Sequence, residues 1–132
     1  MADRLFGELN SPDNVAARRR IFQNINDDLE VGLKNLSQED QDAMKTVLNS
    51  LDRLSFLTQS GWIPDELVLP WTHPMIAKSW EKLEPYVLYE RKRRNEPYFY
   101  RYTGRLAARC NQWRAENLKA EELKTKWVDN AL

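Results

Sequence analysis

The sequence predicts one all-α domain over residues 1–132, folded as a compact antiparallel bundle of four to five helices. Two observations favour this fold class. Apolar residues recur at spacings of three and four along several stretches, which is typical of helices with one buried face. The chain also has only four glycines and six prolines, fewer than the many tight turns of an all-β fold would need. We therefore expect short N-terminal helices, longer helices after them, and a Pro-rich central connector.

The N-terminal stretch is predicted to form two short helices. Ser11 and Pro12 combine an N-cap side chain with a proline at the first helical position, so the second helix should begin there. Residues 26–36 contain asparagine, aspartates and a glycine, which predict a turn. Three leucines are available to anchor a single helical turn there: Leu29, Leu33 and Leu36.

The clearest predicted helix covers about residues 38–60. Ser37 is a suitable N-cap, and the acidic Glu39 and Asp40 follow in the first turn, where they suit the helix dipole. Gly61 is a natural residue to end this helix, because glycine readily adopts the left-handed conformation. One face of the helix carries the apolar residues Met44, Val47, Leu48, Leu51 and Leu54.

Prolines are expected to divide the second half of the chain. Three of them fall within residues 62–74, which we interpret as the connector, with a short helix starting near Pro64. A longer helix should follow, kinked or restarted at Pro85, and another should begin after the break at residues 95–97. The apolar face of this helix is predicted to consist of Phe99, Tyr102, Leu106, Cys110 and Trp113. Residues 120–128 are predicted to form a last short helix.

Charge and cysteine content indicate the compartment. The 20 basic and 20 acidic residues cancel, so the whole chain has no long-range attraction for nucleic acid or an anionic membrane. A lone cysteine suits a reducing compartment, and the first residues lack the pattern of a signal peptide. No uncharged stretch approaches the roughly 20 apolar residues that span a bilayer. We expect a soluble, cytoplasmic protein.

Catalytic, metal and cofactor motifs are missing from the sequence. His73 is the only histidine, and the four glycines stand apart, so a multi-histidine metal site and a Gly-rich phosphate loop are both excluded. A Cys110–His73 nucleophile and base can be drawn, but Cys110 lies on the apolar stripe, where a buried thiol is the expected filler. His73 precedes a proline and is interpreted as a turn or cap residue. We expect no enzyme activity and no cofactor.

Basic residues concentrate in residues 88–119. Nine basic and three acidic residues there give a net charge of +6, so the rest of the chain carries −6. Arginines mixed with tyrosines resemble surfaces that hold a nucleic-acid backbone. Alternatively, they pair with acidic residues such as Asp40 or Asp42, or are simply solvated. The candidate anion or nucleic-acid contacts are Arg91, Arg93, Arg94, Arg101, Arg105 and Arg109.

Tryptophans supply the other candidate surface. Trp80 and Trp113 fit helical stripes and are expected in the core. Trp62 and Trp71 fall in the predicted connector, so they are the candidates for contact with a partner, because exposed tryptophan often contributes strongly to interfaces.

Part of the sequence resembles a bacterial family of small helical domains of unknown function. The resemblance covers about residues 51–94 and rests on three sequence motifs. They are Leu51-Asp52-Arg53-Leu54, Gly61-Trp62-Ile63-Pro64-Asp65-Glu66-Leu67, and Trp80-Glu81-Lys82-Leu83-Glu84-Pro85-Tyr86, the last of which leads into Glu90-Arg91. It implies a helical fold and a bacterial origin, and it implies no activity, cofactor or catalytic residue.

Together these observations predict a non-enzymatic helical interaction module, acting as a subunit, adaptor or regulator of a larger bacterial assembly. Its partner is expected to be protein, either a second copy or a larger complex. The alternative is nucleic-acid backbone binding through residues 91–109.

Overall fold

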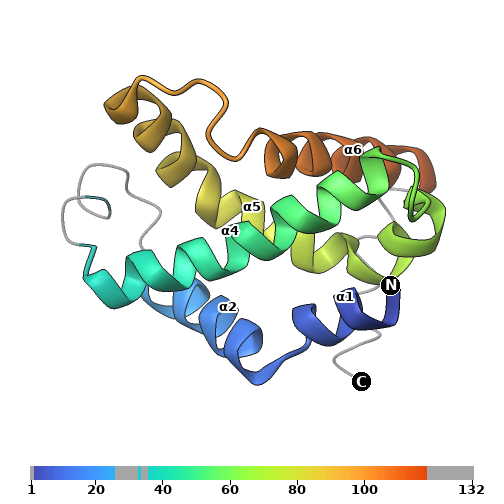
Figure 1. The fold of residues 1–132 in the computed structure, drawn as a ribbon, viewed down its shortest axis with the longest axis horizontal. Helices are drawn as coiled ribbons and strands as arrows, with labels where there is room; N and C mark the ends of the chain where they lie inside the picture. The colour runs from blue at the N-terminus through green and yellow to red at the C-terminus, as the bar shows by residue number, and fades with distance from the viewer. Residues whose placement is uncertain (1, 26–32, 34–35, 119–132) are drawn as a thin grey trace.

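The chain folds as an all-α bundle, as predicted (Figure 1). The fold is that of a computed structural model, which describes residues 2–25, 33 and 36–118. The helices identified in these ranges are α1 (Ala2–Leu9), α2 (Pro12–Asn24), α4 (Gln38–Gln59), α5 (Asp65–Arg94) and α6 (Arg101–Asn117). The predicted helix at residues 120–128 and Trp127 lie outside the described residues, as does most of the predicted turn at residues 26–36.

Helix α4 crosses the whole molecule and contacts each of the other four helices (Figure 1). Arg20 of α2 pairs with Asp40 at the start of α4, while Asn14 bonds to Ser50 further along, so α2 and α4 are antiparallel. Helix α5 returns antiparallel to α4, and α6 turns back again along α5. Helix α6 therefore runs in the same direction as α4 and packs beside it.

The predicted caps are present. The hydroxyls of Ser11 and Ser37 accept from backbone amides three residues later, at 3.2 and 3.1 Å. At the end of α4, Gly61 has φ +81°, its amide donates to the Thr58 carbonyl at 3.2 Å, and the next amide donates to the Leu57 carbonyl at 3.1 Å. These two bonds form a Schellman motif, in which glycine avoids the steric cost of a left-handed Cβ.

The core lies between the inner faces of α2, α4, α5 and α6. The apolar stripe predicted for α4 is fully buried, and it packs against α5 and α6 through residues that include Ile76, Leu83, Val87 and Leu106. Trp80 and Trp113, predicted to lie in the core, are half-buried and pack against its edge. Helix α5 thus has one side buried in the core and an outer side that faces away from it.

The predicted Pro-rich connector at residues 62–74 is wrong: a turn occupies only its beginning. Helix α5 starts at Asp65 and runs through Pro70, Pro74 and Pro85 to Arg94. A proline inside a helix leaves the carbonyl four residues earlier without its amide donor. Those carbonyls belong to Glu66, Pro70 and Glu81, which are exposed, so water can satisfy them. Buried neighbours such as Val68, Leu69 and Ile76 hold the helix on the core side.

The link from α5 to α6 has unusual backbone geometry. Asn95 and Tyr100 both have φ 53°, in the left-handed region. Asparagine tolerates this region, whereas tyrosine there is strained. Contacts hold Tyr100 in place: its hydroxyl donates to Asn49 Oδ1 of α4 at 2.6 Å, and its ring packs edge-on against Phe99.

None of the helices in the described ranges has the length and apolar character that a membrane span requires.

Candidate functional site

The six candidate arginines do not form one basic surface. Arg109 donates its Nε to Asp65 Oδ2 at 3.0 Å and its Nη2 to the Thr58 hydroxyl at 2.7 Å. Arg93 and Arg94 bond to the buried carboxylate of Glu90. Three of the six arginines therefore pair with carboxylates, but not with Asp40, which is bound by Arg20 of α2.

Arg91 holds the link between α5 and α6. Its Nε donates to the Phe99 carbonyl at 2.8 Å, and its Nη2 lies 3.5 Å from the Tyr100 carbonyl. These bonds brace the strained backbone at Tyr100. The side chain of Arg91 is thus already engaged inside the fold, although it also borders a groove.

Arg101 and Arg105 are exposed and, unlike the exposed Arg93 and Arg94, they do not bond to Glu90. Neither has a carboxylate at ion-pair distance among the residues that the structure describes. Arg101 lies over the rings of Tyr98 and Tyr102 at 5.4 and 4.9 Å, and Arg105 lies 5.7 Å from the Tyr102 ring. Cation–π contact with tyrosine leaves the outer face of each guanidinium available to solvent.

These two arginines border an open groove of about 520 Å³ between α5 and α6. Gly104 on α6 faces Trp80 here, and a Cβ at that position would lie 3.7 Å from the Trp80 ring, at ordinary van der Waals distance. The Trp80 indole donates to Glu84 at 2.9 Å across the rim. Three guanidinium groups and one carboxylate line the groove, so its local charge is positive.

Cys110 and His73 do not form a nucleophile and base. The thiol of Cys110 is fully buried and lies 3.5 Å from the backbone carbonyl of His73, not from its imidazole. Burial raises the pKa of this thiol, which keeps it protonated at neutral pH. His73 is a buried residue of α5, where its Nδ1 accepts from Arg114 and its ring packs on Trp113. The expectation that it caps a turn is wrong, because the helix includes it.

Trp62 and Trp71 are among the most exposed large apolar side chains of the described residues, with 68% and 85% of their surface accessible. Trp71 belongs to a stripe on α5 at positions i, i+3, i+4 and i+7, which consists of Leu67, Pro70, Trp71 and Pro74. All four are exposed, and the opposite side of the same turns is buried. A helix segment that is apolar on both sides is typical of a buried position, and among the described residues no element covers this outer stripe.

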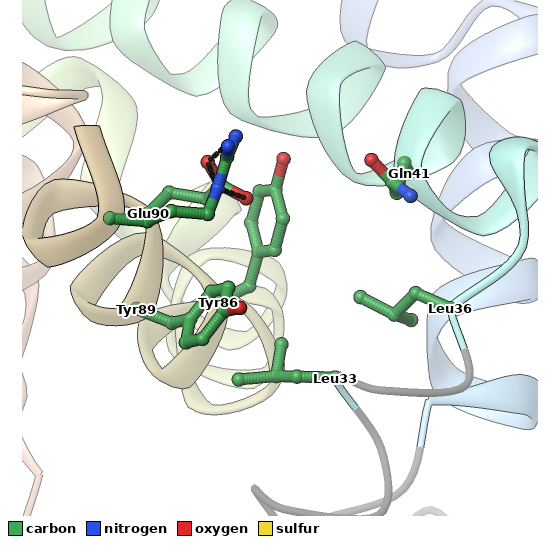
Figure 2. Close-up of a pocket in the computed structure, with 7 residues that line it drawn as sticks. Leu33, Leu36, Gln41, Tyr86, Tyr89 and Glu90 are labelled. Atoms are coloured by element: carbon green, nitrogen blue, oxygen red, sulfur yellow. Dashed lines mark hydrogen bonds and ion pairs between the residues drawn. The ribbon is translucent and has the colours of Figure 1, made fainter.

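A second cavity lies where α5 faces the start of α4 (Figure 2). It has a volume of about 210 Å³. Leu33, Leu36 and Tyr89 supply apolar walls, while Gln41, Glu90, Arg93 and the ring of Tyr86 complete the lining (Figure 2). The Tyr86 hydroxyl projects between Glu90 and Gln41, and it has no hydrogen-bond partner among the described residues.

Glu90 is the buried acid beside this cavity, with 6% of its surface exposed. Burial alone would raise its pKa, but hydrogen bonds from Arg93 and Arg94 outweigh that effect, so the pKa of Glu90 is lowered. Both guanidiniums reach the same carboxylate at 2.7 to 3.2 Å. The three side chains together carry one net positive charge.

Sequence reasoning missed Tyr86 and Glu90. Glu90 could have been found from its i+3 and i+4 spacing to Arg93 and Arg94, which predicts ion pairs on one helix face. The cavity itself had no sequence signal, because its lining comes from residues more than 40 positions apart.

The family model described as a domain of unknown function (DUF4760) matches residues 4–110. The match confirms the resemblance to an uncharacterised family and extends well beyond residues 51–94. No curated protein and no solved structure matches the chain.

Proposed function

Because the chain belongs to the DUF4760 family, whose function is unknown, we propose from its own surface that it is a non-enzymatic interaction module. It would act in the bacterial cytoplasm as a subunit, adaptor or regulator of a protein assembly. The observation that carries this proposal is the exposed stripe of Leu67, Pro70, Trp71 and Pro74, with Trp62 in the turn just before the helix.

The chemistry of the stripe favours the apolar face of a partner helix. Trp71 is 85% exposed at its centre, and Leu67, one turn earlier, is 63% exposed. Burying a tryptophan and a leucine at the centre of an interface is a common source of binding energy. Pro70 and Pro74 also keep the backbone of this face fixed, so little conformational entropy is lost on binding.

The experiment compares Trp71→Glu with Leu88→Glu, a matched change of an exposed apolar residue elsewhere on α5. A photo-crosslinking residue at position 71 should form an adduct in the native host, and one at position 88 should not. Light scattering on the purified chain identifies the case in which the partner is a second copy. Trp71→Glu should then weaken binding of the purified, identified partner at least about tenfold, consistent with a central hot spot.

Two results contradict this proposal. One is that the purified chain is monomeric and that the residue at position 71 crosslinks to the same molecules as the residue at position 88. The other is an identified partner that binds Trp71→Glu and the unchanged chain equally well.

A second candidate function is anion binding in the α5–α6 groove, including the backbone of single-stranded nucleic acid. It is favoured by Arg101 and Arg105, whose charges have no carboxylate partner among the described residues. With two such arginines, binding should be weak, and its salt dependence should have a slope of roughly −1.4 on logarithmic axes.

An electrophoretic shift series with single-stranded DNA and RNA over a range of salt tests the groove. Changing both Arg101 and Arg105 to glutamine should abolish the shift, whereas Arg19→Gln, an exposed arginine of α2, should not. Absence of binding at low salt, or equal binding by both variants, would rule out this candidate.

A further inference from the structure

The Tyr86 hydroxyl is the starting point, because it is both buried and unbonded. Tyr86 is 2% exposed, and its hydroxyl oxygen has no hydrogen-bond partner among the described residues. Buried polar groups in native proteins are nearly always hydrogen-bonded, so each exception calls for a physical explanation. Figure 2 shows that this hydroxyl lies at the edge of the cavity between α5 and the start of α4.

The cavity has the size and lining of a small-molecule site. Its volume of about 210 Å³ exceeds the roughly 150 Å³ that holds a benzene ring in an apolar protein cavity. The side chains of Leu33, Leu36 and Tyr89 give it apolar walls, and the Gln41 amide lies across from Tyr86 (Figure 2). Polar groups, among them the Arg93 guanidinium and the Glu90 carboxylate, line the rest of the cavity, and apolar side chains beside convergent polar groups are common in ligand sites.

The neighbouring charges select the polar group of the ligand. Both oxygens of Glu90 already accept from Arg93, and one of them also accepts from Arg94, so this carboxylate is a weaker acceptor for a ligand donor than an unpaired one. The three groups leave one positive charge in excess beside the cavity. A hydroxyl donor next to a positive charge favours an oxygen acceptor, neutral or anionic.

We propose that this cavity binds a small one-ring organic molecule whose carbonyl or carboxylate oxygen accepts a hydrogen bond from Tyr86. The ring lies against Leu33, Leu36 and Tyr89, and the Gln41 amide lies near the polar end. Binding gives the Tyr86 hydroxyl the partner that the described part of the fold does not supply.

Saturation-transfer NMR with benzamide, benzoate and toluene tests the proposal on the full chain. All three rings should bind, and the two with an oxygen acceptor should bind more tightly than toluene. Tyr86→Phe should weaken benzamide and benzoate about fivefold, as expected for one hydrogen bond, and should leave toluene unchanged. Leu36→Trp, which fills the cavity, should abolish binding of all three.

The unliganded Tyr86→Phe variant gives an independent readout. If the hydroxyl is unbonded in the free protein, the variant should be at least as resistant to urea as the unchanged chain. A clear loss of stability would mean that the hydroxyl has a protein partner, and this would overturn the proposal. So would failure of all three probes to bind, or equal binding of benzamide and benzoate to Tyr86→Phe.

The test is separate from that of the interaction stripe. Trp71→Glu changes the outer face of α5 and should leave binding of the three probes unchanged, so either proposal can fail while the other stands.

Discussion

Arg109 of α6 and Asp65 of α5 form an ion pair of 3.0 Å that joins the start of one helix to the middle of the other. The same guanidinium donates to Thr58 at the end of α4. One residue therefore connects three helices around the α4–α5 turn. Arg105, one helical turn earlier, is exposed and makes no such bond. Two arginines that look equivalent in the sequence thus have different roles.

Replacing Arg109 with alanine should therefore lower the free energy of unfolding by about 1–3 kcal/mol, because it leaves the carboxylate and hydroxyl partners unbonded. The other oxygen of Asp65 is already buried without a hydrogen-bond partner among the described residues, which adds to the cost. Arg105→Ala should change stability by no more than about 0.5 kcal/mol, as for most surface substitutions. Urea unfolding of both variants measures the difference, and equal losses would contradict it.

Alkaline pH should lower the stability of the fold through the buried hydroxyl of Tyr100. Burial, with smaller effects of Tyr86 and Asp52, raises the pKa of Tyr100 from 10.0 to about 12. In the unfolded chain this phenol ionises near its ordinary pKa, while the folded chain keeps the proton. Its contribution to stability is therefore fully present below the unfolded pKa and is lost as the pH rises toward about 12.

Urea unfolding at increasing pH, for the unchanged chain and for Tyr100→Phe, tests this expectation. The variant should be less stable at neutral pH, because it lacks the bond to Asn49, but its stability should fall less steeply in alkali. Burial also raises the pKa of Tyr86, so some slope should persist in the variant. Identical slopes would show that Tyr100 does not contribute.

Local signals in the sequence predicted much of the fold. Ser11, Ser37 and Gly61 each act within a few residues of their own position, so capping rules located those helix ends correctly. The error in α5 arose because proline rules are also local. They penalise Pro70 and Pro74 but do not include the burial of Val68 and its neighbours in the core, which holds the helix together.

The candidate sites were less predictable, because tertiary contacts determine them. Arg101, Arg105 and Arg109 belong to one set of candidate anion contacts in the sequence, but only Arg109 lies near Asp65 in the fold. No periodic pattern could show that the Tyr86 hydroxyl would be buried without a partner. The exposure of Trp71 likewise depends on which side of α5 the rest of the bundle covers.

Gly61 provides a test of backbone conformation. Its φ of +81° is costly for any residue with a Cβ, although no atom lies within 4 Å of where that Cβ would be. Gly61→Ala should therefore lower stability by about 1 kcal/mol through backbone strain alone. Gly7→Ala, in helix α1 with equally open space, should instead be neutral or stabilise slightly. Thermal unfolding of the two variants makes the comparison, and a neutral Gly61→Ala would be inconsistent with the left-handed turn.

The ion pairs of Glu90 should make the protein sensitive to acid. The lowered pKa of Glu90 means that its contribution to stability is present above its unfolded value of 4.5 and is lost as the pH falls through the folded value. Glu90→Gln keeps the shape but leaves Arg93 and Arg94 without a counter-charge. Because both guanidiniums are partly exposed, we expect a loss of only about 1–3 kcal/mol at neutral pH.

Urea unfolding at neutral pH and at a series of lower pH values separates the charge of Glu90 from its packing, because the carboxylate takes up a proton only in acid. The difference between Glu90→Gln and the unchanged chain should shrink as the pH falls through the folded pKa of Glu90, where both side chains become neutral. Glu81→Gln, an exposed change on the same helix, should show no such dependence. A difference that stays constant with pH would assign the loss to packing rather than to the two ion pairs.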